Sequence, residues 1–190
     1  LGAVQAQIIG HQKIDEWNGG FDGVIDWRAA FGTCAKYLGD LNDDGMVEGA
    51  IGARWDPGTS WDRGAVWILT LQPTGLVHSF QKISAEEGGM QGALLTDAEF
   101  GASLELLPDI DNDGKPNLLV GAQCQAAPNV TSGAIWILNL NDDGTVASKV
   151  QFLYPGDQDL SAEFGVSATY MGDFNGDGRH EIAVGATKVD

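Results

Sequence analysis

The stretch that decides the fold of this chain is Asp40-Leu-Asn42-Asp-Asp44-Gly45-Met-Val-Glu48, an acidic segment that occurs three times. The other copies are Asp109-Ile-Asp111-Asn-Asp113-Gly114-Lys-Pro-Asn117 and Asp173-Phe-Asn175-Gly-Asp177-Gly178-Arg-His-Glu181. Each copy has oxygen-bearing side chains at positions 1, 3, 5 and 9 and glycine at position 6. Glycine adopts sharply turned backbone conformations that other residues take only at a cost. The stretches are therefore three tight loops of one kind.

The spacing of oxygens in these loops suits Ca²⁺, which takes about six to eight oxygen ligands and needs a turned loop to collect them. A main-chain carbonyl at position 7 would add a further ligand in each loop. The predicted ligands are Asp40, Asn42, Asp44, Met46 and Glu48; Asp109, Asp111, Asp113, Lys115 and Asn117; and Asp173, Asn175, Asp177, Arg179 and Glu181. We expect weaker binding in the middle loop, because its ninth residue is a neutral asparagine.

The loops differ from EF-hand loops on their C-terminal side. An EF-hand loop closes with a bidentate glutamate at position 12 and lies between two helices. Position 12 here is Ile51, Val120 or Val184, each inside a short apolar run that ends in Gly-Ala. Short apolar runs bounded by turn residues are typical of buried strands. The sequence therefore predicts calcium loops that join two strands.

Clusters of Asp, Asn and Gly also form plain turns that bind no metal. The segment Asn141-Asp-Asp-Gly144 provides an internal comparison, since it lacks the ninth oxygen and the flanking pattern of the three loops. We interpret it as a hairpin turn. The complete pattern of the three repeated loops favours metal binding over a plain turn.

Charge and composition exclude some classes of partner. The chain has 190 residues and a net charge of −17, from 27 acidic and 10 basic residues. Nucleic acid and acidic membrane surfaces are disfavoured, because binding them requires many Lys and Arg side chains. No apolar run approaches the length of a membrane-spanning helix, so no membrane insertion is expected. Calcium is abundant outside cells, which favours a secreted or cell-surface protein.

The repeat extends well beyond the acidic loops. Phe-Gly pairs begin at residues 31, 100 and 164, which lie 69 and then 64 residues apart, and a Gly-Ala pair follows each at a constant distance. Self-similarity of this period indicates a solenoid, a propeller or an array. The first full repeat predicts four strands, at about 31–39, 48–53, 64–71 and 76–83. One four-stranded sheet per repeat is typical of a β-propeller blade.

These motifs resemble FG-GAP repeat proteins, the calcium-binding blades of integrin α-subunit propellers and their bacterial relatives. The similarity covers about residues 6–187 and rests on Phe-Gly, the acidic loop and Gly-Ala, in that order, three times. The Pro of a Gly-Ala-Pro motif is replaced by Arg54, Gln123 and Thr187, which affects the following loop and not the metal site. The resemblance implies a β-propeller used for adhesion or ligand binding outside the cell.

The expected fold is therefore all-β, with about three propeller blades of four antiparallel strands. We expect residues 1–14 to form the outer strand of a preceding blade, 15–83 the first blade with its connector, 84–151 the second, and 152–190 the first half of a third. Propellers close with about four to eight blades, and the resembled family usually has seven. The remaining blades are then expected from the same longer chain or from another copy.

Several single residues leave alternatives open. Trp67 and Trp136 are repeat-equivalent and are expected in the core, whereas Trp17, Trp27, Trp55 and Trp61 either line a ligand surface or tuck under their own loops. Asn129-Val-Thr131 fits a glycosylation acceptor. Cys34 and Cys124 occupy non-equivalent positions, which favours two buried thiols over a disulfide.

No sequence pattern indicates catalysis, because G-x-S-x-G and H-E-x-x-H are both absent and the three histidines occupy unrelated repeat positions. We therefore predict no enzyme activity. The expected function is calcium-stabilised adhesion or binding of a protein or carbohydrate ligand outside the cell. The alternatives are an accessory propeller of a secreted hydrolase and a structural repeat of a surface or filament protein.

Overall fold

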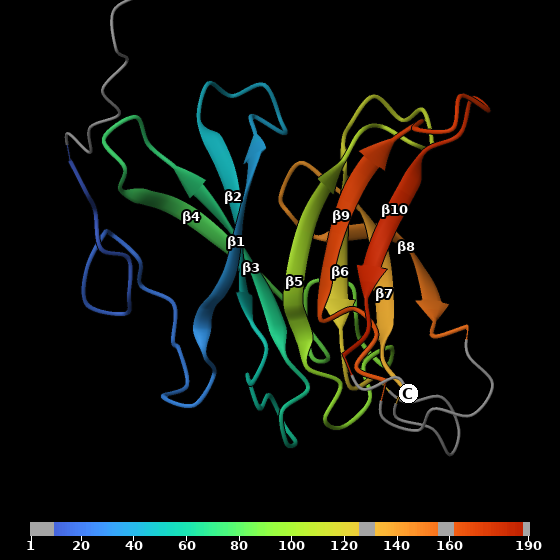
Figure 1. Cartoon of the computed structure of the whole chain (residues 1–190). Coiled ribbons are helices and arrows are strands. Elements are labelled where there is room, and N and C mark those ends of the chain that lie inside the picture. The colour runs from blue at the N-terminus through green and yellow to red at the C-terminus, as the bar shows by residue number, and fades with distance from the viewer. Residues whose placement is uncertain (1–9, 126–131, 156–161, 188–190) are drawn as a thin grey trace, which may run out of the picture.

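The computed structural model describes residues 10–125, 132–155 and 162–187, which form three antiparallel sheets (Figure 1). The first sheet has strand order β1-β2-β3-β4, the second β5-β6-β7-β8, and the third pairs β10 with β9. The strands are β1 (Phe31–Gly39), β2 (Val47–Ala53), β3 (Ala65–Leu71), β4 (Val77–Ser84), β5 (Phe100–Leu107), β6 (Asn117–Ala122), β7 (Ala134–Leu140), β8 (Val146–Leu153), β9 (Ser167–Gly172) and β10 (Glu181–Gly185). The all-β, propeller-blade fold expected from the sequence is confirmed.

The strands of the first sheet agree with the predicted ranges to within one residue at each end. Residues Ala65–Leu69 of β3 are buried on both faces, as expected for a strand between neighbouring sheets. The outer strands β4 and β8 are more exposed. The predicted hairpin at Asn141–Gly144 is also present, with the amide of Gly144 donating to the carbonyl of Asn141 at 2.9 Å.

The Phe-Gly and Gly-Ala motifs face each other inside a blade. Phe31 pairs with Ala53 across β1 and β2, and Phe100 pairs with Ala122 across β5 and β6. The second and third Phe-Gly pairs are also junctions to the preceding blade, because Phe100 bridges Gly64 and Phe164 bridges Gly133 in parallel fashion. The two motifs therefore recur together because they form both the first strand pair and the contact between blades.

One side-chain hydrogen bond crosses each of the two junctions between neighbouring blades. The thiol of Cys34 donates to the carbonyl of Gly101 at 3.2 Å, and the hydroxyl of the repeat-equivalent Ser103 donates to the carbonyl of Gly165 at 2.8 Å. Burial raises the pKa of the Cys34 thiol to about 11 and so keeps it protonated. Cys124 donates to Glu99 rather than forming a disulfide.

The largest hydrophobic cluster lies between the first two blades. It joins Val66, Ile68 and Ile83 of the first blade to Trp136 and Leu138 of the second. Met90, in the connector between these blades, is fully buried within it. A smaller cluster packs Phe21 of residues 15–30 against Trp67 of the first blade. Trp67 and Trp136 are thus core residues, as predicted.

Some expectations concern segments at the edges of the described structure. Gly10–Ile14, which belong to the outer strand expected at 1–14, are not in a strand, since a strand needs a partner to pair with. Asn129 lies outside the described residues. Within the described parts of the chain, no helix is long and apolar enough to span a membrane.

Candidate metal centre

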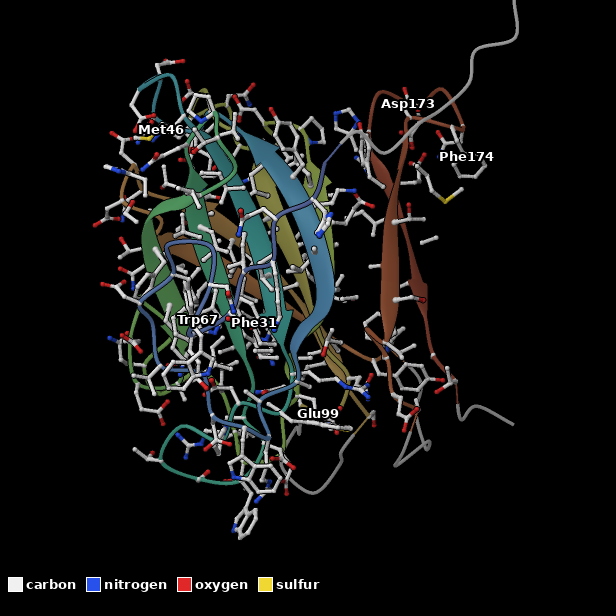
Figure 2. All side chains as sticks on the ribbon, turned by 90° about the vertical axis from the view of Figure 1, so that its left-hand side faces the viewer. Phe31, Met46, Trp67, Glu99, Asp173 and Phe174 are labelled. Atoms are coloured by element: carbon white, nitrogen blue, oxygen red, sulfur yellow. The ribbon has the colours of Figure 1, made fainter. Side chains whose placement is uncertain are left out.

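The three acidic loops lie at the same end of the molecule, at the top of Figure 1, where they connect β1 to β2, β5 to β6 and β9 to β10. Figure 2 shows Met46 of the first loop and Asp173 and Phe174 of the third at this end, with Glu99 at the opposite end. Each loop joins the first and second strands of its blade. The repeat thus places three equivalent loops side by side.

The backbone of each loop turns twice through the left-handed region. Position 4 has a positive φ in all three loops, at Asp43, Asn112 and Gly176, and so does the glycine at position 6. Aspartate, asparagine and glycine tolerate this conformation better than other residues. Two left-handed residues separated by one position curl the chain around the side chains at positions 1, 3 and 5.

The first aspartate of each loop holds this turn by accepting backbone hydrogen bonds. Asp40 Oδ1 accepts from the amide of Asp44 at 3.1 Å, and its Oδ2 accepts from Gly45 at 2.9 Å. Asp109 and Asp173 accept from the corresponding amides at 2.9–3.1 Å. The fifth residue in turn accepts from the amide of the seventh, at 2.7–2.9 Å. These hydrogen bonds hold each loop in its turned shape.

Position 9 closes each loop from the start of the second strand. Glu48 accepts the amide hydrogen of Leu41 at 2.8 Å, Asn117 that of Ile110 at 2.9 Å, and Glu181 that of Phe174 at 3.0 Å. A carboxylate can make this bond with one oxygen and still offer the other to a cation. The ninth residue therefore has a structural role in addition to its predicted role as a ligand.

Carboxylate oxygens gather closely in two of the loops. Among the described residues, Asp109, Asp111 and Asp113 each place one oxygen within 4.8 Å of the others, and so do Asp173, Asp177 and Glu181. Such a group of like charges opposes its own ionisation unless a cation or hydrogen-bond donors compensate for it. The cluster geometry and the all-oxygen donor set fit a hard divalent cation such as Ca²⁺.

In the first loop, a different observation indicates that the residues fit a metal ion. Glu48 is only 3% exposed, and its Oε1 has no hydrogen-bond partner among the described residues. A buried carboxylate oxygen without a partner carries a large desolvation cost. A cation held by Glu48 together with Asp40 and Asp44 would remove that cost. These residues therefore fit a metal ion.

The middle loop differs from the other two at position 9. Asn117 uses its oxygen for the amide of Ile110, and its Nδ2 donates to Asn139 on β7, which in turn donates to Asp111. Asn139 was not among the residues predicted from sequence. The one available signal is a polar residue inside the apolar run of β7, where the first blade has Thr70. In the middle loop, the NH2 group of Asn117 thus takes the place of the second, anionic carboxylate oxygen that Glu48 and Glu181 provide in the other loops.

Hydrogen bonding also alters the ionisation of this loop. Partial desolvation opposes ionisation of Asp109, but amide hydrogen bonds from Gly114, Asn112 and Asp113 outweigh it and lower the pKa of Asp109 below its usual value. Lys115 pairs with Asp142 of the neighbouring hairpin. The aspartate is thus kept anionic, which is the form that binds metal.

The four tryptophans whose placement the sequence left open are all exposed and do not tuck under their loops. Trp55 and Trp61 lie between β2 and β3, and Trp17 and Trp27 lie in the segment that precedes β1. The loop between β2 and β3 runs at the end of the first blade opposite the acidic loops (Figure 1). The molecule therefore has an acidic end and, on the first blade, an aromatic end formed by Trp27, Trp55 and Trp61.

Comparison with known proteins agrees with the repeat. Residues 109–184 match the family described as FG-GAP-like repeat. The chain is 39% identical to integrin alpha-5 of Xenopus laevis over 92 residues and 43% identical to integrin alpha-8 of Mus musculus over 93 residues. Each of these matches covers 48% of this chain and 8% of the relative.

A longer match links the chain to integrin alpha-PS5 of Drosophila melanogaster, at 29% identity over 153 residues, or 77% of this chain and 14% of the relative. The chain thus spans a small part of the length of these relatives. The residues that match the family model, 109–184, contain the second and third acidic loops. The chain is thus similar to FG-GAP-like repeats over residues 109–184 and to integrin alpha chains over as much as 77% of its length.

Proposed function

We propose that this chain is a calcium-binding, integrin-like β-propeller segment of an adhesion or ligand-binding protein that works outside the cell. The observation that carries the proposal is the threefold repetition of one preorganised acidic loop. In each loop, side-chain oxygens already accept the turning backbone amides. The one lysine of the three loops, Lys115, pairs outside its loop with Asp142. Such a loop is built to receive a cation.

Calcium would act here as a structural clamp. It would bind the side chains at positions 1, 3, 5 and 9 and thereby fix the first strand of each blade to the second. Because like charges repel when no ion is present, metal binding and loop stability would be coupled. The proposed setting is a secreted or cell-surface protein, where calcium is abundant enough to fill sites of moderate affinity.

The proposed blades follow the sheets. The first would comprise residues 15–83, the second 84–151, and residues 152–190 would contribute the inner strands of a third. The edges of the first and third sheets would pack against further blades of the same kind, from the same chain or another copy. The proposed ligand of such a propeller is a protein or carbohydrate outside the cell.

Isothermal titration calorimetry of chelator-treated protein with CaCl₂ tests the metal sites. Up to three ions should bind, with dissociation constants of about 10⁻³ M or tighter. The variants Asp44→Ala and Asp177→Ala should each lose one site. Asp22→Ala removes the same charge from an exposed connector position and should lose none.

Circular dichroism of each variant before the titration separates a lost site from a lost fold. The absence of calcium heat in the wild-type protein would overturn the proposal. So would unchanged titrations of folded Asp44→Ala and Asp177→Ala, because both side chains lie at the fifth position of their loops.

A further inference from the structure

The aromatic end of the first blade carries a groove that the acidic loops do not explain. A hollow of about 380 Å³ lies between Trp27, Arg28, Ser60 and Trp61, and a second of about 400 Å³ adjoins it through Trp27 and Arg28. Ligand sites in proteins typically have volumes of about 300–1,000 Å³. Trp27 is 89% exposed and Trp61 64% exposed, so both indole rings face solvent.

The repeat provides an internal control for these tryptophans. The second blade has Thr96 where the first has Trp27, Asp97 where it has Arg28, and Cys124 where it has Trp55. The same backbone position in the second blade therefore needs neither an indole nor a guanidinium. Trp67 and Trp136, by contrast, are tryptophan in both blades and buried in both. The exposed cluster belongs to the first blade alone and is not a requirement of the fold.

An arginine orients the aromatic rings. The guanidinium carbon of Arg28 lies 4.8 Å from the centre of the Trp61 ring and 5.9 Å from that of Trp27. A terminal nitrogen of Arg28 lies 3.6 Å from Asp62 Oδ1. Cation–π contacts at exposed sites are weakly attractive, so Arg28 favours this arrangement of the two rings. The groove thus presents two exposed indoles with a charged hydrogen-bonding group between them.

The loop that carries Trp61 is held firmly by the next blade. The carbonyls of Trp61 and Asp62 accept from the amides of Asp97 and Glu99 at 3.0 and 3.1 Å. On the other side of the groove, Asp26 accepts the amide hydrogen of Arg28 at 2.8 Å. Little conformational entropy would therefore be lost on binding, which favours affinity.

The lining combines apolar ring faces with groups that bind hydroxyls. The pyranose ring of a sugar has an apolar face of C–H groups that stacks on an indole, and a rim of hydroxyls that donate and accept hydrogen bonds. Asp26, Arg28 and Ser60 offer acceptors and donors beside the two rings. The net charge of −17 repels acidic ligands, and the described residues that line the groove include no unpaired cation to attract them.

We propose that this groove binds a neutral carbohydrate, with Trp27 and Trp61 as stacking platforms and Arg28 and Asp26 as hydrogen-bonding partners. The inference rests on the ligand-binding part of the proposed function and names the class of ligand. It places the carbohydrate at the end of the blade opposite the acidic loops. Ligand and calcium would therefore occupy separate sites.

Affinity gel electrophoresis of the full 190-residue chain tests the proposal with mixed-linkage β-glucan, galactomannan and soluble starch in the gel, together with pull-down on cellulose and chitin. At least one neutral polysaccharide should retain the wild-type protein. Trp27→Ala and Trp61→Ala should each weaken the association at least about tenfold, as expected for the loss of a stacked ring. Tyr37→Ala removes an exposed aromatic ring on β1, outside the groove, and should leave the association at the wild-type level.

Trp27 makes so little packing contact that Trp27→Ala keeps the test valid even if Trp61→Ala does not fold. A failure of every neutral polysaccharide to retain the protein would overturn the proposal, as would retention that both tryptophan variants preserve. Retention only by acidic polygalacturonate or alginate would overturn it as well. Calcium titration of the same samples distinguishes a failure of the carbohydrate proposal from a failure of the calcium proposal, since the tryptophan variants should bind calcium like the wild type.

Discussion

Single glycines decide how closely neighbouring blades approach. A Cβ at Gly52 would collide with the carbonyl of Gly101, and one at Gly121 would collide with the carbonyl of Gly165. These glycines have ordinary backbone angles, so close approach and not a left-handed turn requires them. The missing side chain of the glycine in the Gly-Ala motif thus leaves room for the main chain of the Phe-Gly motif in the next blade.

We expect Gly52→Ala to lower the free energy of unfolding by at least about 1–3 kcal/mol, the usual cost of an overfilled contact. Gly49→Ala on the same strand is the matched control, because its added Cβ would lie 3.7 Å from the nearest atom, the carbonyl oxygen of Lys36. Urea denaturation compares the two. Equal stabilities would mean that the blades do not pack through these glycines.

The ninth residue of each loop should set the order of calcium affinities. The middle loop has an amide at this position, and affinity rises with the charge of the ligands. We therefore predict weaker binding in the middle loop than in the first and third. Asn117→Glu should raise the calcium affinity of the middle loop, and Glu48→Gln should lower that of the first loop. Each change should be roughly tenfold, or about 1.4 kcal/mol.

Calorimetry of these two variants gives the comparison with the wild type. For Asn117→Glu the side chain of Asn139 must reorient, because its oxygen, which accepts from Asn117 Nδ2, would face the new carboxylate while its NH2 group donates to Asp111. If the middle loop of the wild type bound calcium more tightly than the other two, or if Glu48→Gln left the calcium affinity of the first loop unchanged, the residue at position 9 would only close the turn.

Each acidic loop is an element whose stability should depend on its ion. Without metal, the clustered carboxylates of Asp173, Asp177 and Glu181 repel one another. Binding to the folded state alone adds about 2.7 kcal/mol per site at a hundredfold excess over Kd. Excess EDTA should lower Tm by several degrees, at about 2–4 °C per kcal/mol for a chain of this size.

Differential scanning calorimetry measures this shift, and an excess of CaCl₂ should restore the original Tm. MgCl₂ at equal concentration should restore less, because Mg²⁺ demands near-octahedral geometry and gives up its waters reluctantly. A Tm unchanged by EDTA would mean that the loops are turns that hold no metal.

Elements of the fold were predictable where local signals coincide. The strands of the first sheet were placed to within a residue, because glycine, proline or an acidic loop separates each strand from the next. The same logic located the plain turn at Asn141–Gly144. Residues 10–14 were not predictable in this way, since whether such a segment pairs depends on a neighbouring strand and not on the segment itself.

Contacts that cross between elements were beyond the sequence pattern. The link from Asn117 through Asn139 to Asp111 joins residues of three different segments. The stacking of Arg28 on Trp61 likewise joins two loops. The repeat identified the loop residues and singled out the exposed tryptophans, but only three-dimensional packing shows which of these side chains meet.

At the scale of the whole molecule, each of the two outer sheets has one open face. The equivalent faces of the inner sheet are covered by its neighbours. Strand β6 is buried throughout, whereas its equivalent β10 is half-buried or exposed at every position. A Cβ at Gly185 would meet only Val166 and Ser167 of its own blade, while those at Gly52 and Gly121 would meet the next one. Strand β1 is mostly exposed or half-buried, whereas its equivalent β5 is mostly buried.

We therefore predict that the isolated 190-residue chain associates through these faces, because exposed apolar sheet surface favours contact with another copy. Small-angle scattering should show a forward scattering that rises with protein concentration. Ser167→Arg, on the open face of β9, should reduce this rise, and Ser148→Arg on the outer strand β8 should not. A compact monomer at all concentrations would contradict the prediction.

The central claim, that the three repeated loops are calcium sites of an integrin-like propeller, is tested most directly by diffraction from crystals grown with CaCl₂. Anomalous difference maps at long wavelength should place one peak in each loop, with ligand oxygens at about 2.3–2.6 Å. The peaks should lie beside Asp44, Asp113 and Asp177, the residues at the fifth position of each loop. Maps with well-ordered loops and no anomalous peak in any of them would contradict the account.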